Sequence, residues 1–110
     1  MQKLVNYHSN LAHGTVFRFP GSYPHEKYVD LILVEFPDSD RKFGLVVSTG
    51  HKAGLILIKL PKEAESNNFA GIDRQWVIDN WNKWIYETCN VDDVYVIQNY
   101  PIPVIDFSKP

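Results

Sequence analysis

Three apolar runs follow one another in residues 29–60, VDLILVEFPDSDRKFGLVVSTGHKAGLILIKL. The runs cover residues 29–36, 43–48 and 54–60, and their β-branched and aliphatic side chains are typical of strands. Turn-forming residues separate them, and connections of about five residues usually join neighbouring antiparallel strands. The pattern therefore predicts an antiparallel meander. The first run is apolar on both alternating faces over most of its length, which predicts a central strand covered on each side.

Two shorter strands are expected outside this region. Residues 15–19, TVFRF, alternate β-branched and aromatic side chains and stop at Pro20. Residues 94–98, VYVIQ, make the last strand of the chain. The tail at residues 100–105 is expected to be extended, because each residue before a proline is pushed out of the helical region.

One helix is predicted over residues 74–86. Asp73 is a suitable N-cap, and Ile72 and Val77 occupy the two positions of a hydrophobic staple. At about 100° per residue, one sector of about 120° collects the apolar side chains Val77, Ile78, Trp81, Trp84 and Ile85. The sequence therefore predicts one α+β domain over residues 1–110, a mostly antiparallel sheet with one main amphipathic helix packed on it.

The composition excludes several classes of protein. The chain has 110 residues, of which 45% are hydrophobic and 22% charged, so it is not a disordered or low-complexity segment. A formal charge of −2 lacks the basic excess of a nucleic-acid binder. The single cysteine, Cys89, cannot form an internal disulfide, and the longest aliphatic run, residues 55–58, is far shorter than the roughly 20 residues of a membrane span. With no signal-peptide pattern at the start, the expected location is the cytoplasm, with no membrane partner.

The residue types that usually carry chemistry do not form a recognisable catalytic or metal-binding set. No cysteine or paired carboxylate completes a ligand set around the histidines, which are His8, His13, His25 and His51. The small-residue loop at 48–54 leads into a strand and lacks the helix that a phosphate-binding loop needs. We therefore predict no catalytic residue, no cofactor and no metal.

Trp76 stands apart from the other two tryptophans. Trp81 and Trp84 lie on the apolar stripe of the helix, whereas Trp76 falls about 80° from it on the helical wheel. Either the loop at residues 66–71 covers Trp76, or its side chain is partly exposed and available as an anchor for a protein partner.

Several segments together resemble a known family of bacterial proteins. They are GTVFRFP at 14–20, VDLILVE at 29–35, GLVVSTG at 44–50, KAGLIL at 52–57 and WVIDNWNKWIY at 76–86, followed by Cys89 and by VDDV at 91–94. In order and spacing they resemble the immunity proteins of polymorphic toxin systems, most closely the immunity protein 45 family. The resemblance covers about residues 4–98 and carries no catalytic residue with it.

The resemblance implies an antitoxin that binds a cognate toxin domain in the cytoplasm. Such toxins are often the C-terminal domains of contact-dependent growth inhibition proteins, many are nucleases, and the immunity protein blocks the active site or the access of substrate. Because an acidic inhibitor face often meets a basic nuclease cleft, the candidate partner-binding residues are Asp38, Asp40, Trp76, Glu87, Asp92 and Asp93. Glu63 and Glu65 are a further acidic pair, and each of these groups can equally be ordinary solubilising charge.

Two other functional classes remain open from the sequence. One is a small-ligand-binding or hydrolytic domain whose site lies between the sheet and the helix and includes His51, Cys89 or Trp76. The other is a structural or oligomerising subunit, and the sequence does not settle the oligomeric state.

Overall fold

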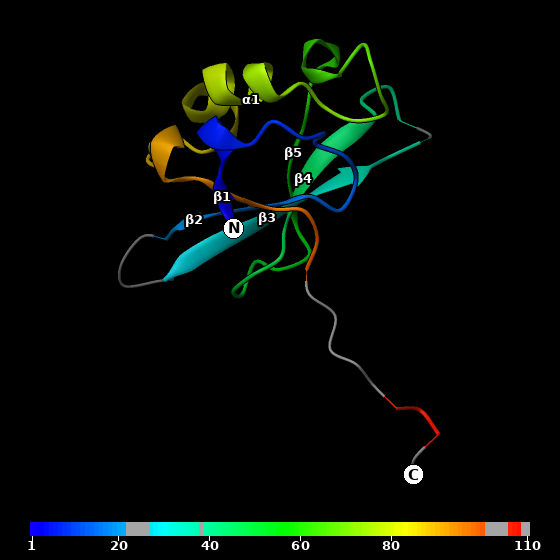
Figure 1. Cartoon of the computed structure of the whole chain (residues 1–110), viewed down its shortest axis with the longest axis vertical. Coiled ribbons are helices and arrows are strands. Elements are labelled where there is room, and N and C mark those ends of the chain that lie inside the picture. Colours follow the sequence, from blue (N-terminus) through cyan, green and yellow to red (C-terminus); the bar gives the residue numbers. More distant parts are fainter. Residues whose placement is uncertain (22–26, 38, 101–105, 109–110) are drawn as a thin grey trace.

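The chain folds as an α+β domain, in which a six-stranded antiparallel sheet carries a short helix on one face (Figure 1). The computed structural model describes residues 1–21, 27–37, 39–100 and 106–108. The strands are β1 (Gln2–Lys3), β2 (Val16–Pro20), β3 (Tyr28–Glu35), β4 (Phe43–Val47), β5 (Ile56–Lys59) and β6 (Tyr95–Ile97). Of the tail predicted as extended at residues 100–105, all but Tyr100 lies outside the described residues.

The order of strands in the sheet differs from a simple meander. The order is β1-β6-β2-β3-β4-β5, so β2 to β5 are neighbours in chain order, whereas β6 lies between β1 and β2. The register places Phe17 opposite both Leu31 of β3 and Val96 of β6. The last strand thus returns to the free side of β2, and β1 adds only two residue pairs beyond it. A two-residue strand has no alternating pattern, which is why the sequence did not indicate β1.

The helical segment predicted over residues 74–86 has two parts. α1 (Arg74–Asn80) is followed by a π-helical turn, η3 (Trp81–Ile85), in which the Tyr86 amide donates to the Trp81 carbonyl at 2.9 Å. Asp73 is the N-cap, and its carboxylate accepts from the Trp76 amide at 3.2 Å. At the other end, the side-chain amide of Asn82 donates to the backbone carbonyls of residues 86, 87 and 89. These bonds fix the chain that leaves the helix.

The main core lies between the sheet and this helical segment. Trp81 is fully buried, and its ring lies 5.9 Å from the ring of Phe17 and 5.4 Å from that of Phe19. Val77 and Ile85 are buried as the apolar stripe predicts, whereas the other two predicted members, Ile78 and Trp84, are only half-buried. The stripe therefore describes the burial of the helix in outline only.

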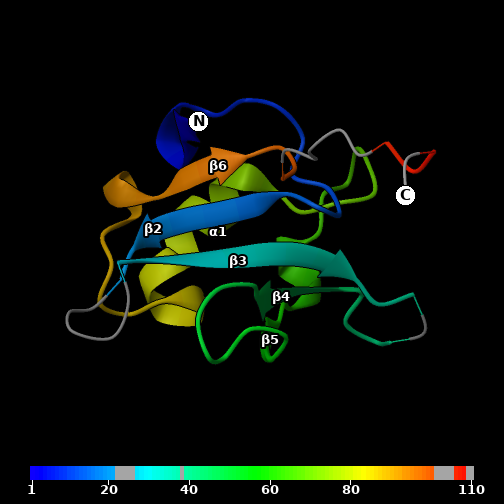
Figure 2. The same cartoon turned by 90° about the horizontal axis from the view of Figure 1, so that it is seen from below.

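On the opposite face of the sheet, the described residues form no covering helix. Figure 2 looks onto this face, with α1 behind the strands. The register aligns one row of apolar side chains across five strands, namely Ile97, Val16, Ile32, Val46 and Ile56. We call this face of the sheet, opposite the helix, the open face. The prediction that the strand at 29–36 is covered on each side holds at Asp30, which is buried, and fails at Ile32 and Val34, which are only half-buried on the open face.

Short 3-10 helices complete the described chain. They are η1 (Leu4–Asn6), η2 (Lys62–Ala64) and η4 (Val91–Asp93). Arg74, at the start of α1, donates to the carbonyl of Leu4 at 3.3 Å and also to that of Val5, so the helix is tied to the N-terminal segment. None of the helices in the described ranges has the length and apolar character that crossing a membrane requires.

Candidate functional site

The acidic residues predicted to bind a partner lie in two separate places. Asp40 is exposed in the connection between β3 and β4, while Asp92 and Asp93 are exposed in η4, and Glu87 is exposed just after η3. In both views the β3–β4 connection and η4 lie toward opposite ends of the sheet (Figures 1 and 2). Asp38 lies outside the described residues. The fold therefore does not gather the two acidic groups on one site.

Trp76 takes the partly exposed alternative. Its side chain is half-buried and packs against the core, and its ring lies 5.9 Å from the ring of Trp84 at an interplanar angle of 55°. This pair of indoles is half covered and half in contact with solvent, which keeps Trp76 available as a contact residue.

The residues named for a hydrolytic site are not brought together. Cys89 is buried and donates to its neighbouring carbonyl at Asn90, and burial raises the pKa of its thiol, with the charge of Asp93 adding to the effect. A raised pKa makes a thiol less reactive at neutral pH. His51 is exposed in the β4–β5 turn. Among the described residues, no group of three His, Cys, Asp or Glu side chains is placed to hold a metal ion.

A cavity of about 250 Å³ opens at the end of the sheet where β3 ends and β4 begins. Glu35, Lys42, Glu65 and Phe69 contribute to its lining. Trp76, Cys89 and His51 do not line it, so the cavity is not the sheet–helix site of the ligand-binding hypothesis.

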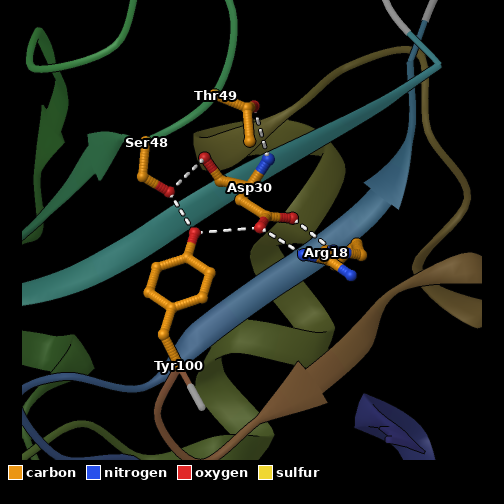
Figure 3. Close-up of polar contacts among 5 residues, drawn as sticks. All are labelled: Arg18, Asp30, Ser48, Thr49 and Tyr100. Atoms are coloured by element: carbon orange, nitrogen blue, oxygen red, sulfur yellow. Dashed lines mark hydrogen bonds and ion pairs between the residues drawn. The ribbon is translucent and has the colours of Figure 1, made fainter. Parts of the chain in front are cut away.

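A buried carboxylate organises the open face, and sequence reasoning did not anticipate it (Figure 3). Asp30 of β3 is 1% exposed, and both of its oxygens accept from the guanidinium of Arg18 on β2, at 2.7 and 2.8 Å. The Tyr100 hydroxyl, which follows β6, donates to the same carboxylate at 2.9 Å and is also hydrogen-bonded to the hydroxyl of Ser48. The backbone of Asp30 bonds to Ser48 and Thr49 beyond the end of β4. These five residues, which we call the Asp30 network, connect β2, β3, the end of β4 and the chain after β6.

The contacts within the Asp30 network keep Arg18 charged and Tyr100 protonated. The hydrogen bonds to Asp30 raise the pKa of Arg18 above its ordinary value, so the guanidinium stays charged. Burial, together with the bond to Asp30, raises the pKa of Tyr100, so its hydroxyl remains a donor well into the alkaline range. The Arg18 guanidinium also lies 4.4 Å from the centroid of the Tyr28 ring. The carboxylate charge of Asp30 is thus neutralised by Arg18, and its oxygens accept hydrogen bonds from within the network. The network therefore holds the strands together.

A second feature of this side of the molecule is the edge formed by β5. Three consecutive aliphatic side chains are exposed there, Leu55 at 60%, Ile56 at 51% and Leu57 at 40%. β5 is an edge strand of the sheet, and within the described part of the chain it pairs only with β4. Ile56 also ends the apolar row of the open face, so the row continues onto an exposed edge. Free strand edges with apolar side chains are natural places for another chain to bind.

The fold is that of a small α+β domain with an exposed aliphatic edge at β5. The sequence model of the immunity protein 45 family matches residues 4–96, so the chain belongs to this family. The resemblance found in the sequence is thereby confirmed. Comparison with the curated proteins and with the solved structures gave no significant match.

Proposed function

We propose that this protein is an antitoxin that binds a cognate toxin domain and neutralises it. The observation that carries the proposal is the match of the immunity protein 45 family to residues 4–96, which spans β2 to β5 in full and β6 up to its last residue, and leaves out only β1. A domain of this family acts on another protein, and the exposed aliphatic edge at β5 supplies the kind of surface that such binding uses.

The mechanism we propose is occlusion of the toxin in the cytoplasm. The immunity protein covers the active site of the toxin or the path of its substrate, and it performs no reaction of its own. Tight binding of this kind comes from a few buried anchors, while charges steer the encounter and select the partner. The toxin is proposed to be the C-terminal domain of a contact-dependent growth inhibition protein, with nuclease activity as the first activity to assay. Asp38, Asp40, Trp76, Glu87, Asp92 and Asp93 remain proposed contacts.

The hydrolytic alternative has little support from the geometry. Cys89 is buried with a raised thiol pKa, and no hydrogen bond of the described residues links it to His51. Nucleophilic catalysis by cysteine needs a base in hydrogen-bond reach of the thiol.

Protection of cells is the direct test of this function. The toxin domain encoded immediately upstream of the gene is induced in cells that carry the immunity protein or an empty vector, and growth is followed. We expect growth only in the cells with the immunity protein. A toxin domain from an unrelated system is the matched control and should kill both strains. Equal killing by the upstream toxin in both strains would contradict the proposal.

A further inference from the structure

We propose that the toxin docks on the β5 edge by adding a short extended segment of acidic character beside residues 55–57. This inference rests on the proposed function and specifies the surface and the chemistry of the partner. It differs from the acidic-face prediction, because here the immunity protein supplies the positive charge.

The first support is the combination of apolar side chains and free backbone at β5. Leu55, Ile56 and Leu57 are each at least 40% exposed, while the equivalent edge on the other side of the sheet, β1, has only two residues, Gln2 and Lys3. An edge strand has one side of its backbone without a strand partner, and an extended segment of another chain can pair there while its side chains pack on neighbouring apolar residues.

Interruptions of the β5 edge limit the length of the segment that can pair there. Val46 pairs with Ile56 and Leu45 pairs with Ile58, so Leu57 is an extra residue in a β-bulge. The carbonyl of Lys59 already accepts from Arg41 at 3.1 Å. A bulge and an occupied carbonyl prevent long, regular pairing. The added segment is therefore short, and the exposed aliphatic side chains supply much of its contact.

The second support is a charge asymmetry in the sequence around β5. Residues 41–62, which contain β4 and β5, hold five of the eleven basic residues and none of the thirteen acidic ones. Their formal charge is +5, and the rest of the chain carries −7. The nearly neutral total therefore conceals a cationic hairpin, and the nearest acidic residues in sequence, Asp40 and Glu63, lie just outside its two ends.

The cations that flank the apolar run have no carboxylate partner among the described residues. Lys52 is exposed in the turn before β5. The ammonium of Lys59, at the end of β5, lies 3.3 Å from the Ser39 hydroxyl and 4.9 Å from the centroid of the Phe36 ring. The Arg41 guanidinium is bonded to a carbonyl. The apolar centre of the edge is thus flanked by positive charge, which complements an aliphatic segment with Asp or Glu on either side.

The same charges argue against a second copy of this chain as the occupant. Pairing of two β5 edges would place one +5 hairpin against another, and like charges across an interface oppose association. An acidic partner gains attraction from the same arrangement, and its association rate falls as salt screens the charges.

The test is a calorimetric titration of the immunity protein into a catalytically inactive form of the upstream toxin domain. Two variants change the proposed surface, Ile56→Asp in the apolar run and Lys52→Glu in the turn. Two matched controls make the same kinds of change elsewhere, Phe107→Asp at a side chain that is 89% exposed and Lys83→Glu on the exposed side of the helix. The thermal midpoint of each variant verifies its fold, and light scattering of the wild type reports self-association.

We expect Ile56→Asp to weaken the Kd by about tenfold or more, and Lys52→Glu to weaken it by about threefold and reduce its salt dependence. The two controls should stay within about twofold of the wild type. Wild-type binding that both β5 variants leave unchanged would overturn this inference and leave the proposed function standing. No binding by the wild type would overturn the proposed function as well. A homodimer that Ile56→Asp dissolves would overturn the choice of the toxin as the occupant.

Discussion

The two faces of the sheet are stabilised in different ways. On the helix side, large apolar side chains meet, with Trp81 against Phe17 and Phe19 in a continuous core. On the open face, the buried carboxylate of Asp30 accepts from Arg18 and Tyr100, and the backbone amide of Asp30 donates to the Thr49 hydroxyl. The first face depends on apolar area and the second on complete hydrogen bonding of a charge.

From this difference we expect the helix side of the sheet to determine stability and the open face with the β5 edge to determine recognition. A face closed by a helix has no surface left for a partner, whereas the open face keeps half-buried side chains and continues to the exposed aliphatic residues of β5. Substitutions on the helix side should change the free energy of unfolding, and those at the β5 edge should change binding with little effect on unfolding.

The largest loss of stability is expected at Trp81. Trp81→Ala leaves a cavity beneath the helix and should lower the free energy of unfolding by about 4 kcal/mol. Among the described residues the indole nitrogen of Trp81 is buried without a hydrogen-bond partner. Trp81→Phe removes that donor and keeps much of the volume, so it should cost less than half as much. Urea denaturation measures both, and equal costs for the two variants would contradict a packing role.

The second effect is expected at the Asp30 network. Arg18→Met leaves the Asp30 carboxylate buried without its cation, and because Arg18 is 30% exposed we expect a moderate loss of about 2 kcal/mol. Adding Asp30→Leu to Arg18→Met removes the unpaired charge and should recover at least half of this loss in the same denaturation assay. A double variant with a lower free energy of unfolding than Arg18→Met would show that Asp30 stabilises the fold through contacts other than its pairing with Arg18.

A smaller and pH-dependent effect is expected at Tyr100. Its pKa is raised in the folded chain, so its contribution to stability is full below the unfolded pKa of about 10 and is lost as the pH rises through the folded value. Tyr100→Phe should cost about 1 kcal/mol at neutral pH. The wild type should lose this advantage at strongly alkaline pH, where the two proteins converge. A constant difference up to about pH 12 would contradict the assigned proton.

The smallest change in stability is expected at β5. Leu55→Ala, at a side chain that is 60% exposed, should alter the free energy of unfolding by less than about 0.5 kcal/mol. The same substitution at buried Leu45 of the adjacent strand should cost about 3 kcal/mol. Comparable costs at the two leucines, measured by urea denaturation, would show that the β5 edge is part of the core.

The sequence predicted the elements that repeat a pattern and missed those that depend on distant contacts. Apolar runs, with alternation at residues 15–19, indicated the strands from β2 to β6, and Asp73 marked the start of the helix. The position of β6 beside β2 was not predicted, because strand order depends on pairing between residues far apart in the chain. The π-helical turn at Trp81 also has no periodic signal of its own.

The candidate site was harder to predict than the fold. A charged residue within an apolar strand, Asp30, is a signal that sequence reasoning can use, but its pairing with Arg18 depends on strand register and its bond to Tyr100 depends on the path of the chain after β6. Net charge concealed another feature of the surface. The acidic candidates followed from the family resemblance, and a total of −2 did not indicate that positive charge is concentrated in the hairpin at residues 41–62.

Amide hydrogen exchange in the presence of the inactive toxin domain tests the docking surface most directly. Residues 55–57 are expected to exchange at least about tenfold more slowly in the complex, because an added strand covers their backbone and side chains. The amides of α1 should change little. Protection confined to η4 and the chain around Glu87, with residues 55–57 unchanged, would contradict docking at β5 and favour the acidic residues as the contact.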